Sequence, residues 1–298
     1  MHGTDLPSDA RSRQDRAQCS LDGLSVGDAI GEQMFFRSID TLPAGPWRYT
    51  DDTAMAAVMV RHLARNERIE QDRLALEFAE EYQRDPYRGY GAMAHWVLRE
   101  IGEGVCWEEA AGSVFGGQGS MGNGGAMRVA PVGAYFADVP ERAVEQAQAS
   151  AQVTHAHAEG GAGAMAVAAA TAWATWWQAH PRRGQGAEMI RFAIAWTPEG
   201  RTREKLRQAL EFRVRIPLEE AVQVLGNGST VLAQDTVPLA IWVAAGHLGD
   251  YEGAIRTISR AGGDADTNAA IVGGICVMSC GRDGIPARWL EQREAPRT

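Results

Sequence analysis

Apolar residues recur at helical spacing along most of the chain, while the alternation of apolar and polar residues typical of a half-buried strand is scarce. Residue types that favour helices, chiefly alanine, leucine, glutamate, glutamine and arginine, fill these stretches. The pattern therefore predicts an all-α fold. Helices are expected at residues 21–36, 51–65, 69–82, 91–101, 107–114, 201–210, 218–225, 234–247, 251–260 and 268–280, with two more inside 143–180.

The chain of 298 residues is long enough for one large domain or two modest ones, and no linker composition divides it. Residues 1–18 carry several charged side chains and few large apolar ones, which predicts a mobile, disordered tail. We expect ordered structure to begin near Leu21 and a single domain to occupy residues 19–298.

Three glycines, Gly23, Gly27 and Gly31, lie four residues apart in the first predicted helix. On a helix this spacing places them in one stripe, where a neighbouring backbone can approach closely. The stripe predicts a tight contact between two helices. Asp28 and Glu32 share another face of the same helix, and they either line a site, satisfy buried donors or meet solvent.

Two short acidic segments stand at predicted helix starts, one near each end of the chain: residues 50–53 (Thr-Asp-Asp-Thr) and residues 264–267 (Asp-Ala-Asp-Thr). Capping explains one such residue but not a run of them, because few amides are free at a helix start. No lysine or arginine lies between Gly262 and Gly281 to neutralise the second segment. Four carboxylates with nearby hydroxyls form an all-oxygen set, which suits Mg²⁺ or Mn²⁺ rather than zinc.

A glycine-rich loop at residues 116–125 precedes a helical segment, so its backbone amides can approach a phosphate or a ribose. Alone this signal is weak, because a flexible surface loop has the same composition and the lysine-containing P-loop signature is absent. Residues 226–229 form a second glycine loop. His155 and His157 are two positions apart and do not share a helix face, so they make a poor metal pair.

Acidic side chains outnumber basic ones, and the net charge is -9. This balance argues against a general nucleic-acid or anionic-membrane surface and favours a small-molecule or protein partner. The cysteines are scattered and the amino terminus lacks a signal-peptide pattern, so we expect a reduced, cytoplasmic protein. The sequence predicts no membrane-spanning helix and leaves the oligomeric state open.

Five motifs follow one another in a specific order across residues 21–280. They are Gly27-Asp28-Ala29-Ile30-Gly31, Thr50-Asp51-Asp52-Thr53, Gly122-Asn123-Gly124-Gly125-Ala126-Met127-Arg128, Thr154-His155 and Gly263-Asp264-Ala265-Asp266-Thr267. In this order they resemble the ADP-ribosylglycohydrolase family, which includes the dinitrogenase reductase activating glycohydrolase and the ADP-ribosyl-acceptor hydrolases. Any one motif would be weak, and the ordered set is strong.

The resemblance implies a compact, all-helical single domain with two Mg²⁺ or Mn²⁺ ions at the base of a cleft that takes ADP-ribose. The metal ligands that it implies are Thr50, Asp51, Asp52, Asp264, Asp266 and Thr267. The residues that it implies for ADP-ribose binding are Ser120, Met121, Gly122, Asn123 and His155, with Gly226 and Gly228 as a looser match.

The chain departs from the family pattern at one position near the proposed metals. Family members often carry a glutamate four residues after the second glycine of the first motif, and this chain has Phe35 there. Glu32, which directly follows Gly31, could take over the acid-base work, or an aspartate or a metal-bound water could do so. The catalytic candidates are therefore Asp51, Asp52, Asp266 and Glu32.

The resulting hypothesis is hydrolysis of the glycosidic bond between ADP-ribose and an acceptor on a protein or a small molecule. A catalytically silent ADP-ribose-binding protein of the same fold is one alternative. A metal-dependent nucleotide phosphohydrolase is another, because an oxygen-rich metal site also serves phosphoryl chemistry. The sequence leaves the acceptor linkage open among arginine, serine, ester and other groups, and it leaves Mg²⁺ and Mn²⁺ undistinguished.

Overall fold

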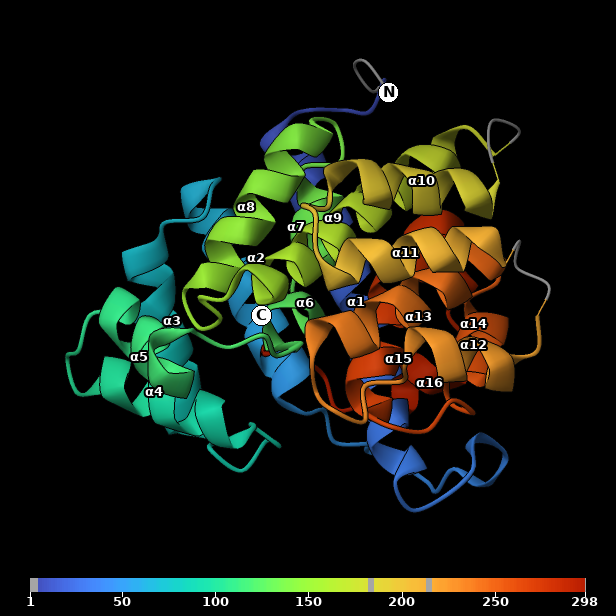
Figure 1. The fold of residues 1–298 in the computed structure, drawn as a ribbon. Helices are drawn as coiled ribbons and strands as arrows, with labels where there is room; N and C mark the ends of the chain where they lie inside the picture. Colours follow the sequence, from blue (N-terminus) through green and yellow to red (C-terminus); the bar gives the residue numbers. More distant parts are fainter. Residues whose placement is uncertain (1–4, 182–184, 213–215, 298) are drawn as a thin grey trace.

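The computed structural model describes residues 5–181, 185–212 and 216–297, and its ordered elements in these ranges are helices (Figure 1). This confirms the all-α prediction. The α-helices are α1 (Ala10–Met34), α2 (Asp51–Asn66), α3 (Gln71–Arg84), α4 (Ala92–Gly102), α5 (Trp107–Gly117), α6 (Gly124–Met127), α7 (Ala130–Tyr135), α8 (Pro140–Gln152), α9 (Ala158–Ala179), α10 (Gly186–Trp196), α11 (Arg201–Glu211), α12 (Leu218–Leu225), α13 (Ala233–Gly246), α14 (Tyr251–Ile258), α15 (Ala265–Cys280) and α16 (Ala287–Gln292). Short 3₁₀ turns are η1 (Ile39–Thr41) and η2 (Arg282–Gly284).

The first helix starts earlier than the sequence predicts. A mobile tail was expected through residue 18, but α1 begins at Ala10, so the expectation is wrong for the last part of that segment. Arg13 and Arg16 both pair with Asp138, and Arg16 also donates to the carbonyl of Ala134 at 2.9 Å. These ion pairs to a distant part of the chain anchor a helical turn that is poor in apolar side chains. The first four residues lie outside the described ranges.

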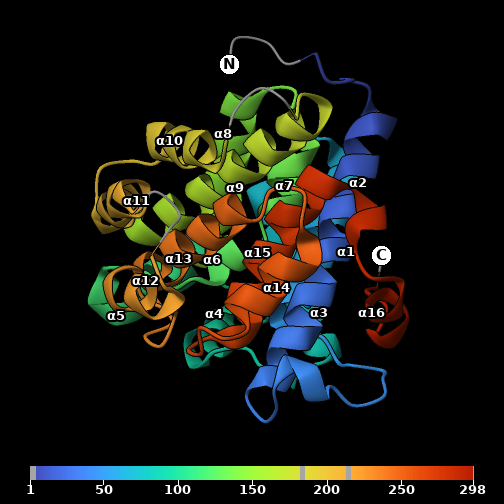
Figure 2. The ribbon, with the colours of Figure 1, turned by 90° about the vertical axis from the view of Figure 1, so that its right-hand side faces the viewer.

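Helices α1 and α15 form the largest helix contact in the described part of the chain, and Figure 2 shows them side by side. A Cβ atom on Gly27 would lie 2.1 Å from the Ala269 carbonyl oxygen, and one on Gly23 would lie 2.5 Å from that of Gly273. The helices run antiparallel, since earlier residues of α1 meet later residues of α15. The predicted glycine contact is confirmed, and it leaves no room for side chains at these positions.

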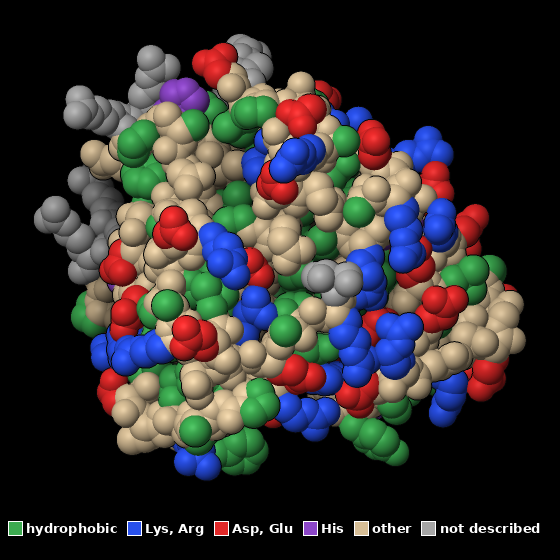
Figure 3. Space-filling view, turned by 180° about the vertical axis from the view of Figure 1, so that it is seen from behind, with side chains coloured by type: hydrophobic (Ala, Val, Ile, Leu, Met, Phe, Trp, Pro, Cys, Tyr) green, Lys and Arg blue, Asp and Glu red, His purple; other side chains and the backbone are tan. Residues whose placement is uncertain are grey.

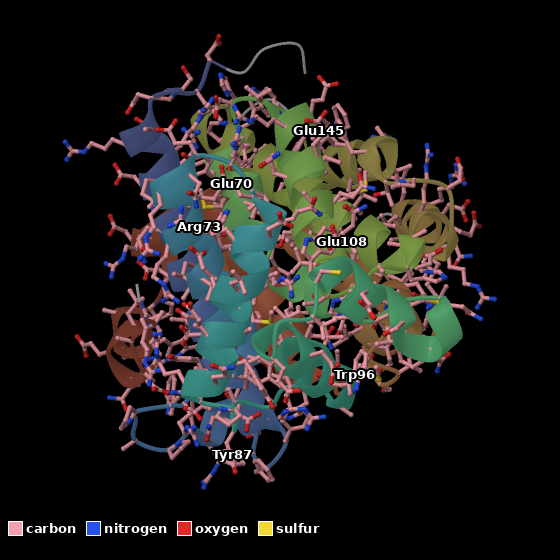
Figure 4. The ribbon with its side chains drawn as sticks, turned by 90° about the vertical axis from the view of Figure 1, so that its left-hand side faces the viewer. Glu70, Arg73, Tyr87, Trp96, Glu108 and Glu145 are labelled. Carbon is pink, nitrogen blue, oxygen red and sulfur yellow. The ribbon has the colours of Figure 1, made fainter. Side chains whose placement is uncertain are left out.

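The remaining helices pack around this pair. Helices α2 and α7 contact α1, whereas α9, α13 and α14 contact α15 (Figures 1 and 2). Helices α3, α4 and α5 form a lateral group that Figure 4 shows face-on, with Trp96 on α4 and Glu108 on α5. Tyr87, which is 86% exposed, projects from the segment between α3 and α4 (Figure 4).

The surface carries both signs of charge. Basic and acidic side chains are interspersed over the rear face of the molecule (Figure 3), in agreement with the many ion pairs that join exposed residues. Within the described ranges, no helix combines the length and the apolar character needed to cross a bilayer.

Candidate metal centre and ligand cavity

A cavity of about 470 Å³ opens where the amino-terminal ends of α2 and α15 meet the glycine-rich loop. It brings together most of the site residues that the sequence predicts, from segments far apart along the chain. The predicted residues among its lining are Asp51, Asp52, Ser120, Met121, Gly122, Asn123, His155, Asp264, Asp266 and Thr267. The predicted residues that are not among its lining are Glu32, Thr50, Gly226 and Gly228.

Three carboxylates from three helices converge beside the cavity. Asp28 on α1, Asp52 on α2 and Asp266 on α15 each offer an oxygen, and these oxygens all lie within 4.8 Å of one another. The first turns of α2 and α15 carry the last two, where free amides and the helix dipole favour negative charge. The packing of α1 against α15 therefore determines whether the carboxylates can meet.

Asp28 has a distinct place in this cluster because protein donors already occupy its oxygens. It accepts hydrogen bonds from the backbone amides of Thr50 at 3.0 Å and Thr53 at 3.1 Å, and from both threonine hydroxyls. The fully buried Asp28 thereby fixes the start of α2 from the neighbouring helix. The sequence left its function open, and the structure shows that it satisfies buried donors.

Thr50 caps α2 and lies between two of the carboxylates. Its Oγ1 is 2.9 Å from Asp28 Oδ1 and 3.0 Å from Asp52 Oδ2, and it accepts the Asp52 amide at 3.4 Å. On the other side, Thr267 Oγ1 donates to Asp52 Oδ2 at 3.4 Å. These contacts orient one oxygen of Asp52 and leave the other free.

The donor set fits a hard cation. Asp52 Oδ1 and Asp266 Oδ1 are buried, and neither has a hydrogen-bond partner among the described residues. A buried carboxylate oxygen without a partner is costly, whereas a divalent cation would satisfy both. Carboxylate and hydroxyl oxygens are the ligands that Mg²⁺ and similar hard ions prefer.

Without a cation, the three clustered carboxylates and the neighbouring Asp51 have raised pKa values. Burial raises the pKa of Asp28 to about 6, and burial together with the charge of Asp28 raises the pKa of Asp51 to about 8. Burial and the charge of neighbouring aspartates also raise the pKa values of Asp52 and Asp266 well above the ordinary range. A cation that binds here would therefore displace protons.

Asp264 is held from the side of the glycine-rich loop. Asn123 Nδ2 donates to Asp264 Oδ2 at 2.6 Å and to Thr236 Oγ1 at 3.0 Å, while the Asp264 amide donates to the Asn227 carbonyl at 3.1 Å. Asn123, which the sequence predicts as a ligand-binding residue, thus also positions an acidic residue of the cluster.

The second glycine loop supports the cluster from behind instead of facing the cavity. Gly226 and Gly228 adopt φ values of 90° and 82°, and a Cβ on Gly228 would lie 2.6 Å from Asp264 Cβ. The tight turn presses the loop against the acidic segment, which explains why neither glycine lines the cavity. The residues that follow, Val231 and Leu232, do line it.

The two loops are joined by backbone hydrogen bonds. The Asn123 amide donates to the Val231 carbonyl at 3.0 Å, and the Ala233 amide donates to the Met121 carbonyl at 2.9 Å. Ser120 Oγ accepts the Gly122 amide at 3.1 Å and closes a turn inside the first loop. These hydrogen bonds therefore fix the two loops that form the cavity wall without a ligand.

Phe115 and Val231 at the cavity are absent from the sequence-based site. Both are non-glycine residues in the left-handed region, with φ of 53° and 54°, and their side chains are 59% and 58% exposed. Such a conformation is strained for these residue types, and strain of this kind clusters at functional sites. No pattern in the sequence marks them, because Phe115 lies between the predicted helix 107–114 and the glycine-rich loop, and Val231 follows the second glycine loop.

Glu32 lies near the cluster along the chain, but its side chain is not among the cavity lining. The preceding Gly31 packs on the start of α15, where a Cβ atom would lie 2.6 Å from Asp266 Cα. Partial burial raises the Glu32 pKa, and Arg48 opposes this shift. Phe35, at the position of the family glutamate, is 49% exposed.

Comparison with known proteins places the chain among enzymes of one family. A sequence model of the ADP-ribosylglycohydrolase family matches residues 9–298. ADP-ribosylhydrolase ARH3 of Homo sapiens is 31% identical over 274 residues, which cover 83% of this chain and 74% of that protein. ADP-ribosylarginine hydrolase Tri1 of Serratia proteamaculans is 22% identical over 308 residues, which cover 93% and 75%.

A solved structure shares the fold. The structure titled "ADP-ribosylglycohydrolase-related protein complex" matches with a TM-score of 0.67 and 23% identity. The match covers 95% of this chain and 93% of that one. At this level of identity the similarity concerns the fold.

Proposed function

The chain belongs to the ADP-ribosylglycohydrolase family, and from this membership we propose that it cleaves the bond between C1″ of ADP-ribose and an acceptor with the help of divalent cations. The proposed metal dependence rests on two buried carboxylate oxygens, one on Asp52 and one on Asp266 beside the cavity, that have no hydrogen-bond partner in the described part of the chain. The family membership supports the bond that is cleaved, and the oxygen donors support the cation.

We propose that two Mg²⁺ or Mn²⁺ ions bind at this cluster. The proposed ligands are Thr50, Asp51, Asp52, Asp264, Asp266 and Thr267. When bound, such ions supply positive charge that orients ribose hydroxyls and makes a water more acidic. Asp28 lies outside this set, because its four accepted hydrogen bonds hold the helix start that presents Asp51 and Asp52.

Glycosidic cleavage places positive charge on the sugar ring and negative charge on the leaving group. The negative carboxylates of Asp51, Asp52 and Asp266 can stabilise the positive charge on the sugar ring, and one of them can accept a proton from the attacking water and pass it to the leaving group. Since Glu32 does not line the cavity, it would have to turn inward before it could act. We therefore assign the proton transfer to an aspartate of the cluster.

The rest of the cavity fits the other parts of ADP-ribose. The Ser120 hydroxyl, the Ser120 and Met121 amides, and His155 offer donors for the diphosphate, while Gly122 and Asn123 shape the loop that presents them. The exposed apolar surfaces of Phe115 and Val231 offer a face on which an adenine ring can stack. The nucleotide would thus extend from the loops to the carboxylates, with the cleaved bond at the cation end.

Product analysis tests this proposal. The purified protein is incubated with arginine-linked, serine-linked and ester-linked ADP-ribose substrates in Mg²⁺, in Mn²⁺ and in chelator. Release of intact ADP-ribose that requires a cation is the expected result, and the preferred linkage identifies the acceptor. Release of AMP instead would identify a phosphohydrolase, and binding without any product would identify a silent ADP-ribose-binding protein.

A further inference from the structure

Arg128 is a fully buried cation that lines the cavity and forms no ion pair within the described residues. Its Nη2 donates to the Ser150 carbonyl at 2.8 Å and to Thr154 Oγ1 at 2.9 Å. The guanidinium also lies over the Phe78 ring, 4.4 Å from its centroid. Its Nε is buried and has no hydrogen-bond partner among the described residues. A buried charge that is only partly hydrogen-bonded is costly, so the contacts of Nη2 indicate a specific task.

The bonds around Thr154 determine where its own proton goes. Thr154 Oγ1 accepts from Arg128, and it lies 2.7 Å from Nδ1 of His155. These are the only partners of that hydroxyl in the described part of the chain. If His155 Nδ1 carried a proton and donated it, the buried threonine proton would have no acceptor, which is unfavourable. The hydroxyl proton of Thr154 has an acceptor only if Thr154 donates to Nδ1 of His155.

A neutral imidazole that accepts at Nδ1 carries its proton on Nε2. This edge of His155 faces the glycine-rich loop: a Cβ atom on Gly122 or Gly124 would lie 3.0 Å or 2.9 Å from Nε2. Those two glycines leave space in front of the nitrogen, and Nε2 has no hydrogen-bond partner among the described residues. His155 lines the cavity, so a ligand oxygen can occupy this space.

We propose that Arg128 and Thr154 are positioning residues that lock His155 as a neutral imidazole with its proton on Nε2, where it donates to a phosphate oxygen of the ligand. The identity of that ligand rests on the function proposed above, whereas the tautomer does not. Burial and then the charge of Arg128 lower the His155 pKa to about 3, so the ring stays neutral at physiological pH. The donor is therefore available over the working pH range and needs no protonation.

Nitrogen NMR of the full-length protein, labelled with ¹⁵N-histidine, tests the tautomer without any ligand. A His155→Gln sample assigns the signals. The wild type is expected to show an acceptor-type Nδ1 and a protonated Nε2 that do not change between about pH 6 and about pH 8. Thr154→Ser should keep this signature, whereas Thr154→Val and Arg128→Met should give a mixed or reversed tautomer. Thr171→Val, which removes a buried threonine hydroxyl on α9 away from the cavity, is the matched control.

Calorimetric titration with ADP-ribose tests the use of the donor. Thr154→Val is expected to weaken binding by roughly tenfold or more, as for the loss of a hydrogen bond to a charged group, while Thr154→Ser and Thr171→Val bind like the wild type. A protonated Nδ1 in the wild type, or an unchanged tautomer in Thr154→Val, overturns the proposed lock. A changed tautomer with unchanged ADP-ribose affinity overturns the ligand contact. Wild-type protein that fails to bind ADP-ribose overturns the proposed function and this contact, while the NMR result still decides the tautomer.

Discussion

Thr267 donates a hydrogen bond to Asp52 across 215 positions of the sequence. Thr267 lies in the first turn of α15 and Asp52 in the first turn of α2, so the contact exists only when both helices pack around α1. Any cation that binds between them binds the folded chain alone, and binding must therefore stabilise the fold. This relationship connects the stability of the protein to its proposed chemistry.

Removal of one carboxylate at the proposed metal site should lower activity without lowering the stability of the fold. We expect Asp266→Asn and Asp52→Asn to lower turnover at least about a hundredfold. Even substitutions of residues that only contact metal ligands typically lower metal affinity or activity about ten- to a hundredfold. The chelator-treated variants should melt at or above the wild-type temperature, because burial and mutual repulsion oppose these charges. Asp283→Asn, at an exposed position, is the control. Near-normal turnover in either cluster variant would refute their assignment as metal ligands.

The raised pKa values predict how stability depends on pH without a cation. Asp28 and Asp51 have pKa values of about 6 and about 8 in the fold, against an ordinary 3.8. Their protonated forms stabilise the fold fully below pH 3.8, and this stabilisation is lost as the pH rises through about 6 and then about 8. We expect the melting temperature in chelator to fall from about pH 4 to about pH 8, and Mg²⁺ to reduce the fall. A flat or rising curve in chelator would be inconsistent with the buried cluster.

Asp28 should matter for cation affinity although it is not a proposed ligand. Asp28→Asn replaces an acceptor of four hydrogen bonds by an amide that cannot accept them all, so the start of α2 should loosen. We expect a loss of about ten- to a hundredfold in Mn²⁺ affinity, measured by calorimetry. Asp22→Asn is a matched control on the same helix, because Asp22 pairs with Arg282 and Arg293 away from the cavity. Equal losses in both variants would show that general destabilisation is the cause.

The glycine contact between α1 and α15 should be sensitive to a single methyl group. A Cβ on Gly27 would collide with the Ala269 carbonyl at 2.1 Å, so Gly27→Ala should lower the free energy of unfolding by about 1–3 kcal/mol or more. Gly112→Ala on α5, where a Cβ meets nothing within 4 Å, should change it by at most about 1 kcal/mol and in the stabilising direction. Chemical denaturation measures both. Similar stabilities of the two variants would argue against the close helix contact.

Features that depend on local sequence could be predicted well. Helical periodicity gave the all-α fold, and the spacing of Gly23, Gly27 and Gly31 gave the helix contact. Most of the acidic and loop residues that line the cavity were also predicted, because polar runs at helix starts are visible along the chain. The resemblance to a known family supplied their common function, which periodicity alone does not contain.

Features that depend on distant contacts could not be predicted. Asp9 caps the start of α1 by accepting the Ser12 amide, but the ion pairs of Arg13 and Arg16 with Asp138 hold this turn on the domain, and no local pattern shows that pairing. Gly228 lies behind Asp264 because of the path of its turn. The exposed side chain of Phe115 results from a left-handed backbone conformation that its sequence neighbours do not require.

Carboxylates from both ends of the chain are proposed to hold divalent cations in one cavity. Titration calorimetry of the chelator-treated protein with MnCl₂ and MgCl₂ measures this directly. Wild-type protein is expected to take up two ions per chain and to release protons, while the double variant Asp52→Asn/Asp266→Asn takes up none with comparable affinity. No uptake by the wild type, or equal uptake by the double variant, would contradict the account.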